Sequence, residues 1–204
     1  DPTKQPFDSN HKLMIGSILP RPIAFVSTKS KDGILNLAPF SYFNGVCSNP
    51  PTVMFAPGRR GYDGLTKDTL NNIRDTEEFV VNIVSEQIAE PMVACATDFD
   101  KDVDEFEVSG LTPVDSVKVV PPRVKESKVS FECTLNTIVP VGEAGPGGGF
   151  VVIGTIIMFH IDDEVYTDGR IDLNTLNPVG RLAGNYYTRV HDTFKIVRQI
   201  KPDN

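Results

Sequence analysis

A short polar run at residues 66–69 has the side chains expected at a phosphate-binding helix start. Thr66 suits the N-cap of a helix over residues 67–75, and Lys67 and Thr69 add a positive charge and a hydroxyl donor. A helix N-terminus carries unpaired amides and a partial positive charge, so phosphate groups bind there readily. Alternatively, the threonines only cap the helix while Lys67 faces water, and these residues alone leave both interpretations open.

Two strand-like runs at residues 23–28 and 34–43 flank a turn that contains Asp32 and Gly33. Glycine tolerates the positive φ that a tight hairpin turn requires. Pro39 in the second run cannot donate a hydrogen bond to a neighbour, so we expect an edge or bulged strand with exposed amides. Such a strand, with room beside Ala38, could hold a flat ligand with polar edges. An ordinary edge strand that proline protects from aggregation would give the same pattern.

Two further segments carry cationic or aromatic side chains that could contact a ligand. Prolines on both sides of Arg21 hold it extended, which suits a surface ion pair or a cation directed at a phosphate. The glycine-punctuated segment 177–187 contains Arg181 and the neighbouring tyrosines Tyr186 and Tyr187. These rings could stack on a flat ligand or pack against a second subunit.

Short strands separated by turns dominate the chain, which is typical of a β-barrel decorated by helices. We expect an N-terminal arm at residues 1–12, a short helix or turn at 13–19, and a helix at 86–95 that Ser85 caps. A flexible hairpin loop is predicted at residues 142–149. Beyond the first hairpin, strands are predicted at 52–56, 78–84, 117–120, 129–141 and 150–161, with a strand or tail at 193–200.

Length and composition exclude several classes of protein. The 204 residues suit one domain over residues 1–204, and a net charge of −7 argues against a general nucleic-acid or anionic-membrane binder. No apolar run approaches the roughly 20 residues of a membrane span, and residues 1–10 lack a signal-peptide pattern. Three widely spaced cysteines indicate neither a zinc site nor disulfides. We therefore expect a cytoplasmic protein.

A calcium loop at residues 98–107 and a catalytic histidine at position 160 are two further functions that the sequence disfavours. The alternating carboxylates between residues 98 and 107 suggest a calcium loop, but the sixth position counted from Asp98 is Val103 rather than glycine. A solvated acidic connection is the better interpretation. His160 ends the predicted strand 150–161 without a Ser or Cys motif for a hydrolase triad, so we expect a structural histidine. Neither a metal site nor a catalytic side chain is predicted.

Several separated motifs together resemble the flavin reductase-like family, the FMN-binding split β-barrels that accompany flavoprotein monooxygenases. The resemblance covers residues 13–189 and rests on RPIA at 21–24, ST at 27–28 before DG at 32–33, NLAPFSYF at 36–43, KDT at 67–69 and GRLAG at 180–184. It implies a mainly β fold, a Greek-key split β-barrel with two or three peripheral helices. It also implies a homodimer with the flavin near the subunit boundary, and an acidic segment that lies away from the flavin phosphate.

The resemblance also implies which residues form an FMN site. Cationic and hydroxyl side chains would hold the phosphate, small polar ones the ribityl chain and ring edge, and apolar ones the ring. The phosphate is assigned to Lys67, Thr69 and Arg21, the ribityl chain and ring edge to Ser27, Thr28, Asn36 and Ser41, and the ring slot to Ala38, Pro39, Tyr42 and Phe43, while Leu37, Asp68, Arg181 and Tyr186 complete the predicted set.

The activity that the resemblance implies is NAD(P)H:flavin oxidoreduction, with NADH or NADPH as electron donor and a separate monooxygenase as acceptor of the reduced flavin. The flavin would carry the chemistry while the protein supplies position and electrostatics. The chain has no Gly-x-Gly-x-x-Gly fingerprint, so it offers no Rossmann site for the nicotinamide. A non-enzymatic FMN carrier or electron-transfer flavoprotein, a pyridoxamine phosphate oxidase-type enzyme and a plain dimeric structural domain therefore remain alternatives.

Overall fold

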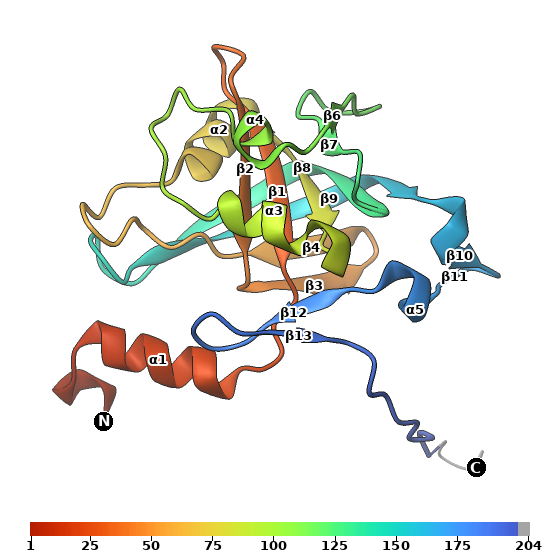
Figure 1. The fold of residues 1–204 in the computed structure, drawn as a ribbon. Coiled ribbons are helices and arrows are strands. Elements are labelled where there is room, and N and C mark those ends of the chain that lie inside the picture. Colours follow the sequence, from red (N-terminus) through yellow and green to blue (C-terminus); the bar gives the residue numbers. More distant parts are fainter. Residues whose placement is uncertain (200–204) are drawn as a thin grey trace.

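Seven strands form one antiparallel sheet in the computed structural model, which describes residues 1–199 (Figure 1). The strand order is β2-β1-β5-β8-β9-β4-β3, so β2 and β3 are the two edges. These edge strands follow each other in the chain, and only Ser41 and Tyr42 join them, a connection that spans roughly 10 Å at most. The sheet must therefore curl until its edges meet at this corner, which makes it a split β-barrel, as predicted. Its strands are β1 (Ala24–Lys29), β2 (Leu35–Phe40), β3 (Phe43–Ser48), β4 (Pro51–Phe55), β5 (Glu78–Ile83), β8 (Val129–Val141) and β9 (Gly149–Ile161).

The remaining elements are short and surround the barrel. The helices are more numerous than the two or three predicted: α1 (Phe7–Ser17), α2 (Asp68–Thr76), α3 (Ala89–Ala94), α4 (Glu105–Ser109) and α5 (Leu173–Leu176), with 3₁₀ turns at Pro2–Lys4, Glu86–Ile88 and Asp163–Val165. Three two-stranded ribbons pair β6 (Pro113–Val114) with β7 (Arg123–Val124), β10 (Tyr166–Thr167) with β11 (Arg170–Ile171), and β12 (Val179–Arg181) with β13 (Tyr187–Arg189). That the whole chain is one domain stays a prediction.

The side chains of β1 alternate between two apolar clusters, as the period of a strand requires. Ala24 and Val26 point into the barrel, whereas Phe25 belongs to an outer cluster with residues of α3 and α4. Leu70 and Ile73 of α2 join the inner cluster, so α2 packs against the barrel core. Because β1 is buried on both faces, its neighbour β2 is attached to a rigid support.

Four strands of the barrel sheet lie close to the ranges predicted from the sequence. β8 coincides with the predicted strand 129–141, β9 begins one residue before the predicted 150–161, and β4 and β5 match their predictions closely. β8 and β9 are joined by the predicted glycine-rich loop. Gly154 in the middle of β9 is required for packing, because a Cβ there would lie 2.3 Å from the buried ring of Phe79.

Two predictions for the N-terminal part of the chain are wrong. The run 34–43 is not one strand but divides into β2 and β3, and no glycine marks the barrel corner between them. The boundary expected between an N-terminal arm at residues 1–12 and a helix or turn at 13–19 is misplaced, because α1 already begins at Phe7. Two hydrogen bonds of 2.8 Å from Nη1 of Arg21 to the carbonyl oxygens of Ile15 and Ile18 hold the C-terminal end of α1. None of the residues of α1 is buried, so contacts from outside the helix such as these hold it in place, and no local pattern shows them.

Neither predicted cap residue makes a capping hydrogen bond with its side chain, although Ser85 does stand at the N-cap of the segment that begins at Glu86. Lys67 is the N-cap of α2, and Oγ1 of Thr66 instead donates to Oδ1 of Asn71 at 2.7 Å. The predicted helix 86–95 begins as a 3₁₀ turn, and α3 starts only at Ala89. Pro91 has no amide to donate and is therefore suited to the first turn of a helix, which explains the restart. Ser85 precedes the 3₁₀ turn, and its buried Oγ has no hydrogen-bond partner among the described residues.

No strand forms at residues 117–120 or 193–199; residue 200, the end of the predicted tail, lies outside the described part of the chain. The backbone amides of residues 117 and 118 donate to Glu132, and that of Val120 donates to Glu78, so carboxylates replace a strand partner. Among residues 1–199, no helix combines the length and the apolar character needed to cross a membrane.

Candidate functional site

A groove follows the outer side of edge strand β2 and consists of two hollows that share Pro39 and Phe40. The α2 hollow lies between β2, the start of α2 and residues 95–99, and the Arg21 hollow lies beyond the barrel corner. Predicted residues line both. Asn36, Ala38, Pro39, Lys67, Asp68 and Thr69 line the α2 hollow, and Arg21, Pro39, Ser41, Tyr42 and Arg181 line the Arg21 hollow.

The start of α2 presents donors to the α2 hollow. Thr69 is almost fully buried, and its Oγ1 accepts a 2.9 Å hydrogen bond from Nδ2 of Asn36 on β2. The first amides of a helix have no acceptor within the helix, so those of Asp68 and Thr69 belong to a positively polarised end. Nζ of Lys67 forms an ion pair with Asp98. Ammonium, amide and polar side chains thus meet at one point, which is the donor set that a phosphate group requires.

The outer edge of β2 is less open than the sequence suggests. Oε2 of Glu105, the first residue of α4, accepts a 3.0 Å hydrogen bond from the amide of Leu37, and Pro39 has no amide to offer. The Glu105 side chain lines the α2 hollow and is 8% exposed, and burial raises its pKa to about 7. Its carboxyl group therefore changes charge near neutral pH.

Arg21 organises the second hollow from within. It is 4% exposed, and besides Ile15 and Ile18 its guanidinium donates to the carbonyl oxygen of Leu182 at 2.9 Å and to Oγ of Ser41 at 3.4 Å. One side chain thus fastens α1, the β12–β13 turn and the β2–β3 corner. Its backbone also pairs with that of Arg181, whose guanidinium lies 4.6 Å from the ring centroid of Tyr187.

Five predicted residues do not line the groove. Ser27 and Thr28 point to opposite faces of β1: Oγ of Ser27 donates to the Pro122 carbonyl at 2.5 Å, and Oγ1 of Thr28 accepts from Asn72 at 3.0 Å. Leu37 is buried in the outer cluster, Phe43 packs against the inner cluster, and Tyr186 is 74% exposed between β12 and β13.

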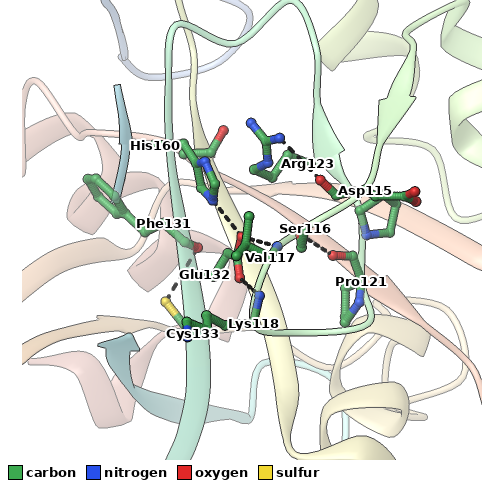
Figure 2. A network of polar contacts seen from close by, with 12 residues as sticks. Asp115, Ser116, Val117, Lys118, Pro121, Arg123, Phe131, Glu132, Cys133 and His160 are labelled. Atoms are coloured by element: carbon green, nitrogen blue, oxygen red, sulfur yellow. Dashed lines mark hydrogen bonds and ion pairs between the residues drawn. The ribbon is translucent and has the colours of Figure 1, made fainter. Parts of the chain in front are cut away.

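A second polar cluster lies on β8, outside the groove (Figure 2). The carboxylate of Glu132 is fully buried and accepts hydrogen bonds from the amides of Val117 at 2.7 Å and Lys118 at 2.6 Å, and from Nε2 of His160 at 2.5 Å. Burial opposes the charge of Glu132, but these bonds outweigh it and hold its pKa below the usual range. The cluster fastens the segment 115–121 to the sheet, in keeping with a structural role for His160.

The site also contains residues that the sequence prediction missed. Arg60, Asp98, Phe99 and Glu105 line the α2 hollow. The basic loop at residues 57–64 is a signal for Arg60. Asp98 of the acidic segment contacts Lys67 directly, so part of this segment lies beside residues predicted to hold the phosphate. Charge complementarity between the two segments is visible only once the fold brings them together.

Comparisons with known proteins agree with this fold. The profile of the family described as Flavin reductase like domain matches residues 15–180. Nitrilotriacetate monooxygenase component B from Bacillus cereus is 37% identical, with a TM-score of 0.91 and 96% of each chain covered. The 2-nitrobenzoate 2-nitroreductase NbaA from Pseudomonas fluorescens is 32% identical, with a TM-score of 0.86 over 98% of this chain and 95% of that one. A Shewanella frigidimarina protein described with a split barrel domain is 25% identical, with a TM-score of 0.82 over 97% and 96%. The chain therefore belongs to the flavin reductase-like family.

Proposed function

We propose that this protein binds FMN in the groove along β2 and catalyses NAD(P)H:flavin oxidoreduction. The observation that carries the proposal is the meeting of Lys67, Thr69 and Asn36 beside Ala38 and Pro39. Residues of two separate motifs form one hollow that has a cationic, donor-rich end and an apolar wall. Those are the two surfaces that a phosphate and a flat ring need.

The residues present fit a flavin nucleotide by their chemistry. Lys67, the free amides at the start of α2 and the Thr69 hydroxyl would hold the phosphate, and Asn36 would orient the polar chain next to it. A bound flavin would supply the redox chemistry by accepting a hydride from the nicotinamide. Arg21 would act indirectly, because carbonyl groups already engage its guanidinium. Its task in this proposal is to hold the wall of the Arg21 hollow in place.

A homodimer is part of the proposal. The two hollows of the groove measure about 50 and 210 Å³, whereas ligand pockets typically measure roughly 300 to 1,000 Å³. The groove of one copy would thus cover only one side of the flavin ring. A second copy would close the pocket around the ring. We further propose one cytoplasmic domain that passes reduced flavin to a separate monooxygenase. The similarity to a protein named as a monooxygenase component supports that partner.

The decisive experiment is steady-state oxidation of NADH and of NADPH with FMN added, followed at the absorbance of the reduced nicotinamide. We expect turnover with at least one nicotinamide and saturation with FMN. Binding of FMN without turnover would favour a non-enzymatic carrier or electron-transfer flavoprotein instead. Absence of both binding and turnover would refute the proposal and leave a structural domain.

The phosphate assignment has its own test. In the double variant Lys67→Ala with Thr69→Ala, FMN binding should weaken by about 2 kcal/mol, roughly 30-fold, since one charge-assisted and one neutral contact are lost. Fluorescence titration measures this, and riboflavin, which lacks the phosphate, should bind both proteins equally. The matched control is Lys31→Ala with Thr76→Ala at the opposite end of α2, where Lys31 forms an ion pair with Asp75. Equal FMN affinity for all three proteins would refute the assignment.

A further inference from the structure

The loop at residues 96–104 connects α3 with α4 and reaches across to the start of α2. The two ends of the loop are joined by a hydrogen bond, in which Sγ of Cys95 donates to the carbonyl oxygen of Glu105 at 3.6 Å. Burial raises the pKa of the Cys95 thiol to about 11, so this donor stays protonated. Asp98 extends from the loop and forms the ion pair with Lys67. The contact between the loop ends is thus separate from the contact with α2.

Asp98 pairs with the ammonium group of Lys67, which is the positive charge that the proposed phosphate site needs. The side chains of Lys67 and Asp98 are 29% and 30% exposed, so the pair is partly screened by water and can be broken. A phosphate that shared Lys67 with Asp98 would lie beside a carboxylate of like charge. Asp68 and Glu105 line the same hollow and add to that repulsion. A phosphate therefore binds best when Asp98 has left Lys67.

We propose that Asp98 is a specificity-determining residue that competes with the ligand for Lys67. This inference rests on the proposed function of the groove. A carboxylate brings one negative charge, whereas a phosphate monoester brings between one and two charges and three acceptor oxygens that can also reach the amides of α2. Phosphorylated flavin displaces Asp98, and a neutral flavin leaves the pair intact. The Asp98–Lys67 pair thereby lowers the affinity for phosphorylated flavin and leaves that for neutral flavin unchanged, so Asp98 sets how strongly the site prefers the phosphorylated form.

The variant Asp98→Asn separates this competition from other effects. We expect it to bind FMN about three- to tenfold more tightly than the natural chain, because a partly exposed ion pair no longer has to be broken. Riboflavin affinity should not change. Asp100→Asn is the matched control, since it removes the same charge from the same loop at a position that does not line the hollow. It should bind FMN as the natural chain does. Fluorescence titration at one ionic strength measures all three proteins.

Three results would overturn the inference: unchanged or weaker FMN binding by Asp98→Asn, an equal gain for riboflavin, or an equal gain in Asp100→Asn. The single variant Lys67→Ala shows whether the site itself is correctly placed. If Lys67→Ala weakens FMN binding but Asp98→Asn does not strengthen it, the competition is refuted and the phosphate site stands. If Lys67→Ala leaves FMN binding unchanged, both the competition and the assignment of Lys67 are refuted.

Discussion

Replacement of Glu132 by alanine should lower the free energy of unfolding by about 3 to 5 kcal/mol, the range for breaking a buried charged network by removal of one partner. The variant leaves the amides of Val117 and Lys118 and the ring of His160 without their acceptor (Figure 2). Urea denaturation at neutral pH measures the loss. Glu126→Ala is a suitable control, because Glu126 also accepts from a backbone amide, that of Thr112, but at an exposed position.

The Glu132 contribution should also depend on pH. Because the folded state holds the pKa of Glu132 below its value in the unfolded chain, the stabilisation is present above the unfolded value and is lost as the pH falls. The natural chain should therefore lose more stability on acidification than Glu132→Gln does. A loss below 1 kcal/mol in Glu132→Ala, or acid unfolding curves that run parallel for the natural chain and Glu132→Gln, would contradict this account.

Glu105 should give the opposite pH dependence. Its pKa rises from 4.5 to about 7 on folding, so in this range the folded chain binds more protons than the unfolded chain. The stabilisation is complete below pH 4.5 and is lost as the pH rises to 7. Relative to Glu105→Gln, whose amide oxygen can still accept from Leu37, the natural chain should lose up to about 3 kcal/mol across that window.

Urea unfolding of both proteins at pH 5 and pH 8 tests the Glu105 prediction. Glu107→Gln serves as the control, because Glu107 lies on the same short helix but is exposed. That variant should follow the natural chain at both pH values. If the difference between the natural chain and Glu105→Gln is the same at pH 5 and pH 8, the carboxyl group does not titrate in this window and the prediction fails.

Much of the barrel is predictable because successive side chains of a strand point to opposite faces, and this leaves a recognisable pattern of apolar residues in the sequence. The long strands β8 and β9 are marked by β-branched residues and by the glycine-rich loop between them, and Pro39 correctly predicts that β2 is an edge. The corner at Ser41 and Tyr42 is not predictable, because barrel closure rather than a local turn signal places it. The first half of α1 is missed for a similar reason, since Arg21 holds the end of this helix from another part of the chain.

The groove is predictable where a motif supplies adjacent functional groups, as in Lys67 to Thr69. It is less predictable where a motif crosses a strand, because neighbours such as Ser27 and Thr28 point to opposite faces. Asp98 and Glu105 lie in a run of carboxylates that looks uniformly solvated. Which of them becomes buried or paired depends on tertiary contacts, and no spacing rule in the run distinguishes them.

The way in which Arg21 is bound limits where the polypeptide can be shortened. Truncation of the leading residues as far as Ser17 looks harmless, since none of the side chains of α1 is buried. The carbonyl oxygens of Ile15 and Ile18 both accept hydrogen bonds from the buried guanidinium of Arg21. The deletion removes the first carbonyl and also removes the helix that positions the second. A trimmed protein would then carry a cation with missing acceptors in the wall of the Arg21 hollow. Deletions meant to improve expression or crystallisation should therefore stop ahead of residue 7.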